Sequence, residues 1–189
     1  MSPRADAIVD VMLGLDPMAD LPRTGWLLRG VRPCESIADH SFAVAFVTML
    51  LVDGLREDGI AIDGERALRM ALVHDTPEAR TGDIPMPSKT PAVKHAMHAL
   101  ERVLVEGLLP ARQREVWIEM ESGDSIEARV VKAADKIQMM IKALVYGRQH
   151  RGDLEEFWRA PKNFDDRGIP FAREVFDAIA TRAGREVPR

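Results

Sequence analysis

The spacing of apolar residues constrains the fold of this chain more than any other feature of its sequence. Ile8, Val11, Met12 and Leu15 lie at positions i, i+3, i+4 and i+7, which places them on one face of a helix. The same period returns in most later segments, and no stretch shows the strict alternation of a half-buried strand. No internal repeat or low-complexity segment interrupts the pattern. The sequence therefore predicts an all-α fold.

Cap and stop signals divide the chain into about six to eight helices. Ser36, followed three residues later by Asp39, is similar to a capping box and opens a strongly apolar helix. A long loop, interrupted by the short piece GWLLRG, is expected over 16–33, where prolines and glycines recur. The expected helices cover approximately residues 3–15, 36–55, 63–74, 91–108, 125–147 and 170–179, with shorter ones around Trp117 and Phe157.

Length and composition are those of one globular domain. The 189 residues are 46% hydrophobic and 30% charged, which supplies a sizeable core in a chain of single-domain length. The net charge of -4 disfavours a general nucleic-acid-binding protein, because such a protein carries a basic excess. We therefore expect one compact domain over residues 1–189 and no nucleic-acid polymer as a partner.

The cysteine count and the N-terminus bear on location. Cys34 is the single cysteine, which excludes an internal disulfide framework and a cysteine-rich zinc site. The N-terminus has no signal-peptide core, and we expect no apolar stretch to approach the roughly 18 residues that a membrane span needs. These features predict a cytoplasmic protein with no membrane partner.

A histidine-aspartate pair, His74-Asp75, lies where an apolar helix is expected to end. Adjacent side chains diverge by about 100° on an intact helix, so one metal ion accepts both most readily where the helix stops. Pro77 disfavours helical geometry at Thr76, so we expect the chain to break there and to restart with Glu78 in a new first turn.

Two other polar residues fall within apolar helices that do not tolerate them unpaired. His40 enters the most apolar helix, and Asp135 lies in the middle of the longest expected one. A divalent cation bound by His40, Asp135 and the His74-Asp75 pair would satisfy all four side chains. Such a donor set suits manganese, iron, cobalt, nickel or zinc. The alternative is that His40 caps a helix and Asp135 pairs with a lysine of its own helix.

The joint pattern resembles the HD-domain metal-dependent phosphohydrolases, which carry a histidine on one helix, His-Asp on the next and a distant aspartate. Four blocks are similar, in order, to the 5'-deoxynucleotidase branch of that family: RTGWLLRGV, ESIADHSFAVA, ALVHDTPEARTGDIP and EARVVKAADKIQMM. The resemblance covers about residues 5–150 and leaves the C-terminal helices over 151–189 without a functional assignment. It implies a single HD-domain helical bundle.

The resemblance also implies roles for individual residues. The two histidines and two aspartates named above would hold one divalent transition metal. Glu78 would serve in acid-base chemistry, and Asp83 would act beside it on the substrate. In some members this loop binds a second, harder cation such as magnesium, which here would take Glu78, Asp83 and the backbone carbonyl of Ile84 as ligands. The alternative role of Glu78 is to stabilise the dipole of a helix first turn.

The block RTGW is implied to hold the substrate. Trp26 would lie against the 2' carbon of the sugar and leave little room for a ribose hydroxyl. Arg23 would clamp the phosphate, with Arg29 as a rival, because some members place the arginine directly before the tryptophan and this chain does not. The alternative is a core tryptophan with solvated arginines.

The function implied is hydrolysis of deoxyribonucleoside 5'-monophosphates, with a nucleotide as small-molecule partner and a homodimer as the assembly. One alternative is another HD phosphohydrolase, acting on nucleoside triphosphates, cyclic nucleotides or alarmones. Further alternatives are a nucleotide sensor without turnover and a helical scaffold without metal. His95 and His98, three residues apart, could extend the metal site. The alternative is that both face solvent, because paired histidines on a helix surface are common without a metal.

Overall fold

The protein is represented by a computed structural model that describes residues 2–85 and 90–188. Within these ranges it is helical, with no strand beyond an isolated bridge between Pro22 and Ser36. The α-helices are α1 (Pro3–Leu15), α2 (Thr24–Leu27), α3 (Ile37–Glu57), α4 (Gly64–Val73), α5 (Glu78–Thr81), α6 (Pro91–Leu108), α7 (Ala111–Ser122), α8 (Ile126–Arg148), α9 (Glu155–Arg159) and α10 (Pro170–Arg182). Two 3₁₀ helices, η1 (Asp16–Ala19) and η3 (Pro161–Phe164), lie between them. The prediction of an all-α fold is confirmed.

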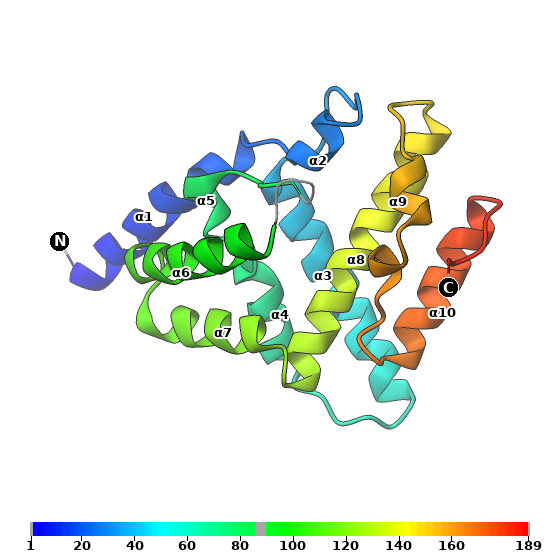
Figure 1. Cartoon of the computed structure of the whole chain (residues 1–189). Coiled ribbons are helices and arrows are strands. Elements are labelled where there is room, and N and C mark those ends of the chain that lie inside the picture. Colours follow the sequence, from blue (N-terminus) through cyan, green and yellow to red (C-terminus); the bar gives the residue numbers. More distant parts are fainter. Residues whose placement is uncertain (1, 86–89, 189) are drawn as a thin grey trace.

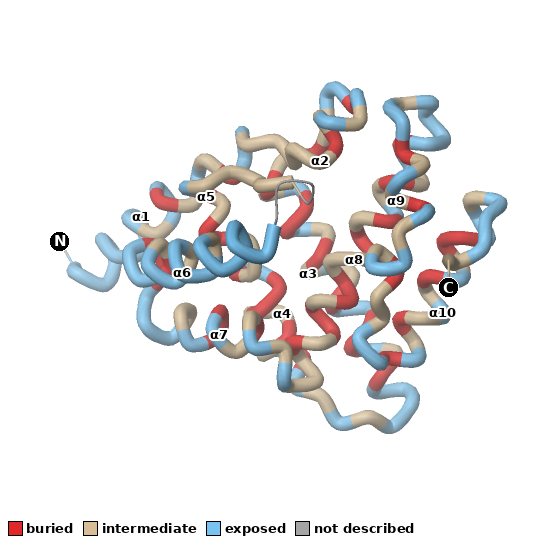
Figure 2. Tube along the Cα trace, viewed as in Figure 1, coloured by how far each residue is buried: buried red, intermediate tan, exposed pale blue. Residues whose placement is uncertain are grey.

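Three helices, α3, α4 and α8, form the centre of the molecule, and each packs against the other two (Figure 1). α7 lies against α4 and α8, while α10 lies against α8 and α3. Buried positions concentrate on the central helices (Figure 2). Val44, Met70 and Met140 are completely buried there, and burying such a side chain contributes roughly 1.5–3 kcal/mol. This centre holds the ends of α3 and α4 and the middle of α8 in fixed positions.

The predicted capping signals set the starts of the central helices. Ser36 and Asp39 form a complete capping box, in which the Asp39 N–H donates to Ser36 Oγ and the Ser36 N–H donates to Asp39 Oδ2. Asp63 caps α4 by accepting the N–H of Arg66 at 2.9 Å. These bonds satisfy backbone donors that a helix start leaves open. They also fix His40 in the first turns of α3.

Two backbone hydrogen bonds hold the long loop before α3 in place. The Arg23 N–H donates to the carbonyl of Glu35 at 3.0 Å, so these two residues lie side by side before α3 begins. Between these two residues, the carbonyl of Arg29 accepts the N–H of Asp153 at 2.9 Å. Gly152 allows this approach, because it has a φ of +73° and an added Cβ would lie 2.5 Å from the Arg29 oxygen. The loop is thereby joined to the segment after α8.

The apolar face of α1 is more exposed than its periodicity suggests. Ile8 is 68% exposed and Met12 is 61% exposed, although both belong to the repeat that predicts the helix. α1 contacts η1 and α6 at the edge of the molecule, and its buried residue is Gly14. Periodicity therefore predicts this helix correctly without predicting which surface it covers.

The expectation that no segment approaches the length of a membrane span is wrong for α3. By length and composition alone, this helix is long and apolar enough to cross a membrane. Its mean hydropathy is 1.4 over an 18-residue window, and 39% of that window is buried. Its apolar character comes from two faces. One packs against α4 and α8, and the other exposes Phe42, Phe46 and Leu50.

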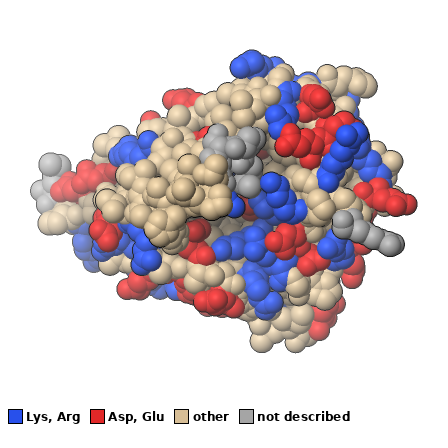
Figure 3. All heavy atoms as spheres, viewed as in Figure 1, with Lys and Arg blue, Asp and Glu red and all other residues tan. Residues whose placement is uncertain are grey.

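The face of the molecule drawn in Figure 3 carries acidic and basic side chains interspersed with one another.

Candidate active site

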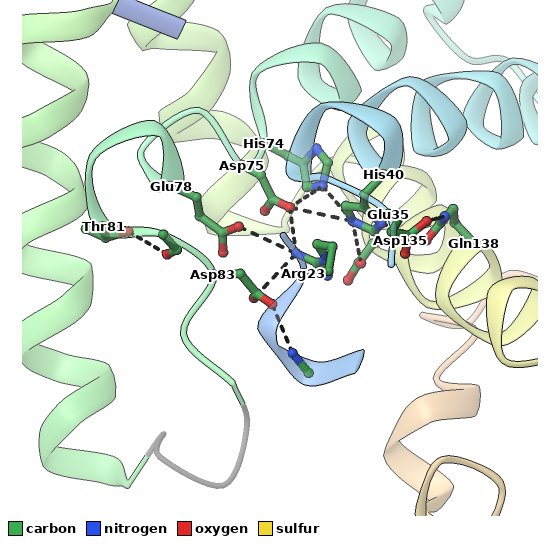
Figure 4. A network of polar contacts seen from close by, with 12 residues as sticks. Arg23, Glu35, His40, His74, Asp75, Glu78, Thr81, Asp83, Asp135 and Gln138 are labelled. Atoms are coloured by element: carbon green, nitrogen blue, oxygen red, sulfur yellow. Dashed lines mark hydrogen bonds and ion pairs between the residues drawn. The ribbon is translucent and has the colours of Figure 1, made fainter. Parts of the chain in front are cut away.

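Four predicted metal ligands converge where α3, α4 and α8 meet (Figure 4). His40 comes from the first turns of α3, His74 from the end of α4, Asp75 from the next residue, and Asp135 from the middle of α8. The two Nε2 atoms lie 3.4 Å apart. His40 Nε2 lies 3.3 Å from Asp135 Oδ1 and 3.5 Å from Asp75 Oδ2, while His74 Nε2 lies 3.2 Å from the same Asp75 oxygen.

The end of α4 explains how His74 and Asp75 reach the same point. α4 ends at Val73, and the chain restarts as α5 at Glu78, as the proline predicts. Thr76 does not cap the new helix. Its hydroxyl instead donates to the carbonyl of Val73, the last residue of α4, at 2.8 Å. Trp117 of α7 donates its indole N–H to the carbonyl of His74 at 3.3 Å. These bonds hold the pair outside a regular helix.

The donor atoms fit a divalent transition metal. Ligand atoms of His40, His74 and Asp135 lie within 4.8 Å of one another, and Asp75 adds an oxygen beside both imidazoles. His74 Nδ1 lies 2.7 Å from the carbonyl of Ala71, so Nδ1 carries the hydrogen and Nε2 keeps its lone pair for a ligand bond. Two imidazoles with carboxylates are the donor set that manganese, iron, cobalt, nickel and zinc share.

The site favours charged carboxylates. Burial alone would raise the pKa of Asp75, but His74 and Arg23 prevail and hold it well below its ordinary value. Burial also opposes ionisation of Asp135, whereas Lys136, 3.1 Å from Oδ2, and His40 keep its pKa well below the usual range. Asp135 therefore pairs with a lysine of its own helix, as the alternative proposed, and still presents Oδ1 to His40.

Metal affinity is expected to rise with pH through the neutral range. Burial disfavours the imidazolium form of His74, but Asp75 and Asp135 outweigh it and raise the pKa above 6.5 in the metal-free protein. Because a ligating imidazole must be neutral, binding displaces a proton until the pH exceeds this raised pKa. Calorimetric metal titrations in buffers of different ionisation enthalpy should count a proton released near pH 6.5 and fewer as the pH rises. A proton count that does not change with pH would contradict this prediction.

Arg23 lies among three carboxylates beside the metal ligands. Its Nη1 is 3.2 Å from Asp75 Oδ2, 3.5 Å from Glu78 Oε2 and 3.5 Å from Asp83 Oδ1. Burial would lower the pKa of the guanidinium, but the carboxylates, Asp75 first, raise it further. Asp83 also accepts the N–H of Gly25 at 3.3 Å, which joins its loop to the start of α2. The Arg23 guanidinium is thus held at the centre of the predicted catalytic residues.

A cavity of about 420 Å³ opens from this centre. That volume is in the range of roughly 300–1,000 Å³ found for small-molecule sites. Trp26 lines the cavity but is only 2% exposed, because Phe157 stacks on it with ring centroids 4.5 Å apart. Arg29 lies farther out and pairs with Glu156 of α9. The structure therefore brings Arg23, Glu78, Asp83 and the metal ligands together, with Ile84 in the same cavity wall and Arg29 away from the centre.

Comparison with known proteins places the chain in a family. The model of the HD domain matches residues 16–170. The chain belongs to the HD domain family. The 5'-deoxynucleotidase hdd1 of Schizosaccharomyces pombe is 35% identical over 82% of this chain and 81% of its own length. The 5'-deoxynucleotidase HDDC2 of Danio rerio is 32% identical over 81% of this chain and 77% of its own length.

A solved structure has the same fold. A conserved hypothetical protein from Pyrococcus furiosus superposes with a TM-score of 0.80, at 35% identity, over 90% of this chain and 98% of that one. The predicted resemblance to HD-domain phosphohydrolases is therefore confirmed. The HD domain is metal-dependent, and His40, His74 and Asp135 place their ligand atoms close enough together to hold one metal ion.

Two buried residues of this HD domain belong to none of the functional patterns predicted from the sequence. Glu35 and Gln138 are each 5% exposed, and together they connect His40 to Trp26. A signal for Gln138 exists in its position three residues after Asp135, on the same face of α8. Glu35 directly precedes the capping Ser36, and its burial follows from the loop contacts rather than from any local pattern.

The segment after α8 forms the outer wall of the cavity in this HD domain. Phe157, Lys162, Asn163 and Arg167 line it, although the sequence offers no functional signal there. These residues reach the cavity because the 151–169 segment folds back along α8, a contact between distant parts of the chain that local periodicity does not encode.

His98 belongs to a second group of side chains that could hold a cation. The sequence pattern suggests a metal role for this histidine but does not predict its partners. His98 is exposed, as expected, but its Nδ1 lies 3.6 Å from Glu121 Oε2, and Glu101 completes the group. Trp117 lies beneath His98, with ring centroids 6.5 Å apart. His95 is exposed and belongs to neither of the groups found among the described residues.

Proposed function

We propose that this protein is a metal-dependent phosphomonoesterase that converts deoxyribonucleoside 5'-monophosphates to deoxyribonucleosides and phosphate. The observation that carries the proposal is the convergence of the four metal ligands with Arg23 and Glu78 at one end of a nucleotide-sized cavity. Relatives more than 30% identical over four fifths of the chain are named 5'-deoxynucleotidases. Both the relatives that share this fold and the donor set of the site support the proposed reaction.

The proposed roles divide between holding and moving charge. His40, His74, Asp75 and Asp135 hold one divalent ion, which we propose to be manganese, cobalt, iron, nickel or zinc. Such an ion supplies Lewis acidity for a phosphoryl oxygen and a lower pKa for an attacking water. Glu78 lies on the same side of the cavity and moves the proton to the leaving 5' oxygen.

Asp83 positions the other groups in this proposal. Its two oxygens contact Arg23 and the Gly25 N–H, so it links the phosphate end of the cavity to the loop that carries Trp26. A second cation held by Glu78, Asp83 and the Ile84 carbonyl would compete with Arg23 for the same two carboxylates. We therefore propose one metal ion for the free enzyme, with a second, such as magnesium, restricted to states in which Arg23 has turned to the substrate.

Arg23 rather than Arg29 is the proposed phosphate clamp. An Arg23→Ala variant should lose about 1.5–3 kcal/mol of interaction with a charged phosphate, which is a fall of roughly 10- to 150-fold in kcat/KM. Arg29→Ala is the matched control and should change kcat/KM far less, because its side chain pairs with Glu156 away from the metal ligands. Steady-state kinetics on one deoxynucleotide measures both. An Arg29→Ala defect as large as that of Arg23→Ala would contradict the assignment.

Trp26 is proposed to disfavour ribose as a fixed wall. Phe157 stacks on the indole and Tyr146 meets it edge-on at 5.3 Å, so the ring cannot swing aside to admit a 2' hydroxyl. The polar side chains of the outer wall, including Lys162 and Asn163, are proposed to face the base. They give the 151–189 segment a role in substrate binding, in line with one domain over 1–189 whose hydrophobic core extends from Trp26 to Ile179.

We also propose a homodimer in the cytoplasm. The candidate interface is the exposed face of α3 that carries Phe42, Phe46, Met49 and Leu50; Phe42 is 70% exposed. A Phe46→Asp variant should shift the mass measured by light scattering from dimer to monomer, since a buried unpaired charge opposes association. Phe46→Leu is the control and should remain dimeric. A wild-type monomer at all concentrations tested would contradict the proposal.

Product analysis tests the reaction against its alternatives. Purified metal-loaded protein should release inorganic phosphate and a deoxynucleoside from a deoxynucleoside 5'-monophosphate. A triphosphate hydrolase would instead release its products from a deoxynucleoside triphosphate. A cyclic nucleotide hydrolase would act on a cyclic nucleotide, and an alarmone hydrolase would act on an alarmone. Saturable nucleotide binding without any product would support the sensor and overturn the esterase.

A further inference from the structure

A buried chain of three polar side chains runs from a metal ligand to the wall of the cavity. His40 Nδ1 lies 2.6 Å from Gln138 Oε1, and Gln138 Nε2 lies 2.9 Å from Glu35 Oε2. Trp26 Nε1 donates to the other Glu35 oxygen at 2.8 Å. His40 is completely buried, and Gln138, Glu35 and Trp26 are each at most 5% exposed. In Figure 4, Gln138 and Glu35 lie on the side of His40 away from His74 and Asp75.

The direction of these hydrogen bonds is fixed at the Glu35 end. A carboxylate only accepts, and Glu35 accepts the Trp26 indole N–H while Lys142 Nζ lies 3.4 Å from Oε2. The group of Gln138 that faces Glu35 must therefore be its NH₂, which donates. The amide oxygen of Gln138 is then turned toward His40, where it can only accept. His40 Nδ1 must carry the hydrogen, which leaves the lone pair of Nε2 facing the other metal ligands.

We propose that Gln138 and Glu35 are positioning residues that hold His40 in the one tautomer able to bind the metal. This inference rests on the proposed function, because it takes His40 to be a metal ligand. His74 reaches the same state by a different route, since its Nδ1 faces the backbone carbonyl of Ala71. At His40, side chains take the role that a backbone carbonyl has at His74. Groups that fix a ligating histidine in this way typically contribute 10- to 100-fold to metal affinity or activity.

A Gln138→Leu variant removes the acceptor while keeping a buried side chain of similar size. In metal-free protein above the histidine titration range, long-range ¹H–¹⁵N spectra should show His40 as the Nδ1–H tautomer in the wild type and as a mixture in the variant. His74 is an internal control and should keep the Nδ1–H form in both, because Ala71 is unchanged. Metal affinity measured by chelator competition should fall about 10- to 100-fold.

A polarity-swapped pair, Glu35→Gln with Gln138→Glu, tests the direction of the chain and covers a Gln138→Leu variant that fails to fold. The carboxylate introduced at position 138 would accept from His40 and from the amide introduced at position 35. The oxygen of that amide would still accept from Trp26. The double variant should therefore keep the Nδ1–H tautomer and bind metal at least as tightly as the wild type. A role in packing alone predicts no such recovery from two buried substitutions.

The outcomes separate this inference from the proposed function. An unchanged His40 tautomer and unchanged metal affinity in Gln138→Leu would overturn it, as would loss of the Nδ1–H tautomer in the double variant. Equal changes at His40 and His74 would also overturn it, because they would indicate general loosening of the site. The tautomer is measured without metal or substrate, so a wild-type protein without esterase activity would sink the proposed function and leave this test intact.

Discussion

Replacing Asp135 by asparagine should abolish metal binding and lower kcat/KM for a deoxynucleotide by about three orders of magnitude or more. The carboxylate is held ionised by Lys136 and His40, so it presents a full negative charge to the ion. An amide offers only a neutral oxygen in the same place, so the ion pair with Lys136 is lost as well. Elemental analysis of the purified variant measures the metal content, and phosphate release measures the rate.

Asp177→Asn is the matched control for this change. Asp177 lies in the middle of α10 and is exposed, so the substitution removes the same charge from a helix outside the site. Metal content and rate should equal those of the wild type. If Asp135→Asn retained both the metal and most of the rate, the assignment of Asp135 as a ligand would be wrong.

Replacing Glu78 by glutamine should lower kcat by about 10²- to 10⁴-fold while the metal content stays at the wild-type level. Glutamine keeps the shape of the side chain but cannot accept and return a proton. Glu78 contacts Arg23 at 3.5 Å and is not one of the three residues His40, His74 and Asp135 whose ligand atoms lie close enough to hold one ion. Steady-state kinetics with elemental analysis of the same samples measures both quantities.

The control for Glu78→Gln is Glu174→Gln, an exposed glutamate of α10. It should leave kcat and metal content unchanged. Loss of metal together with rate in Glu78→Gln would show that Glu78 serves as a ligand, as in the two-cation alternative. An unchanged kcat would return Glu78 to the role of stabilising the first turn of α5.

The sequence predicts where the four proposed ligands lie because their positions follow local rules. The capping box of Ser36 and Asp39 fixes where α3 starts, and with it the position of His40. Pro77 ends α4 beside His74-Asp75, which allows adjacent side chains to point to one ion. These features depend on a few neighbouring residues, so one sequence is enough to place them.

The remaining features depend on contacts between distant parts of the chain. Gln138 meets Glu35 across 103 positions, and Arg29 meets Glu156 across 127. Periodicity identifies α1 and α3 as helices but does not show that Ile8 and Phe42 face outward, since an apolar face reads the same whether it packs inside or lies on the surface. The wall around Phe157 could not be predicted for the same reason.

The most direct test of the proposed function is phosphate release by chelator-stripped protein that has been reloaded separately with manganese, cobalt, magnesium and zinc. Matched deoxyribonucleoside and ribonucleoside 5'-monophosphates examine the metal and the sugar together. We predict no release without metal, restored release with at least one transition metal, and faster release from the deoxynucleotide of each pair. Release from no monophosphate under any metal, or equal release from stripped and reloaded protein, would contradict the proposed function.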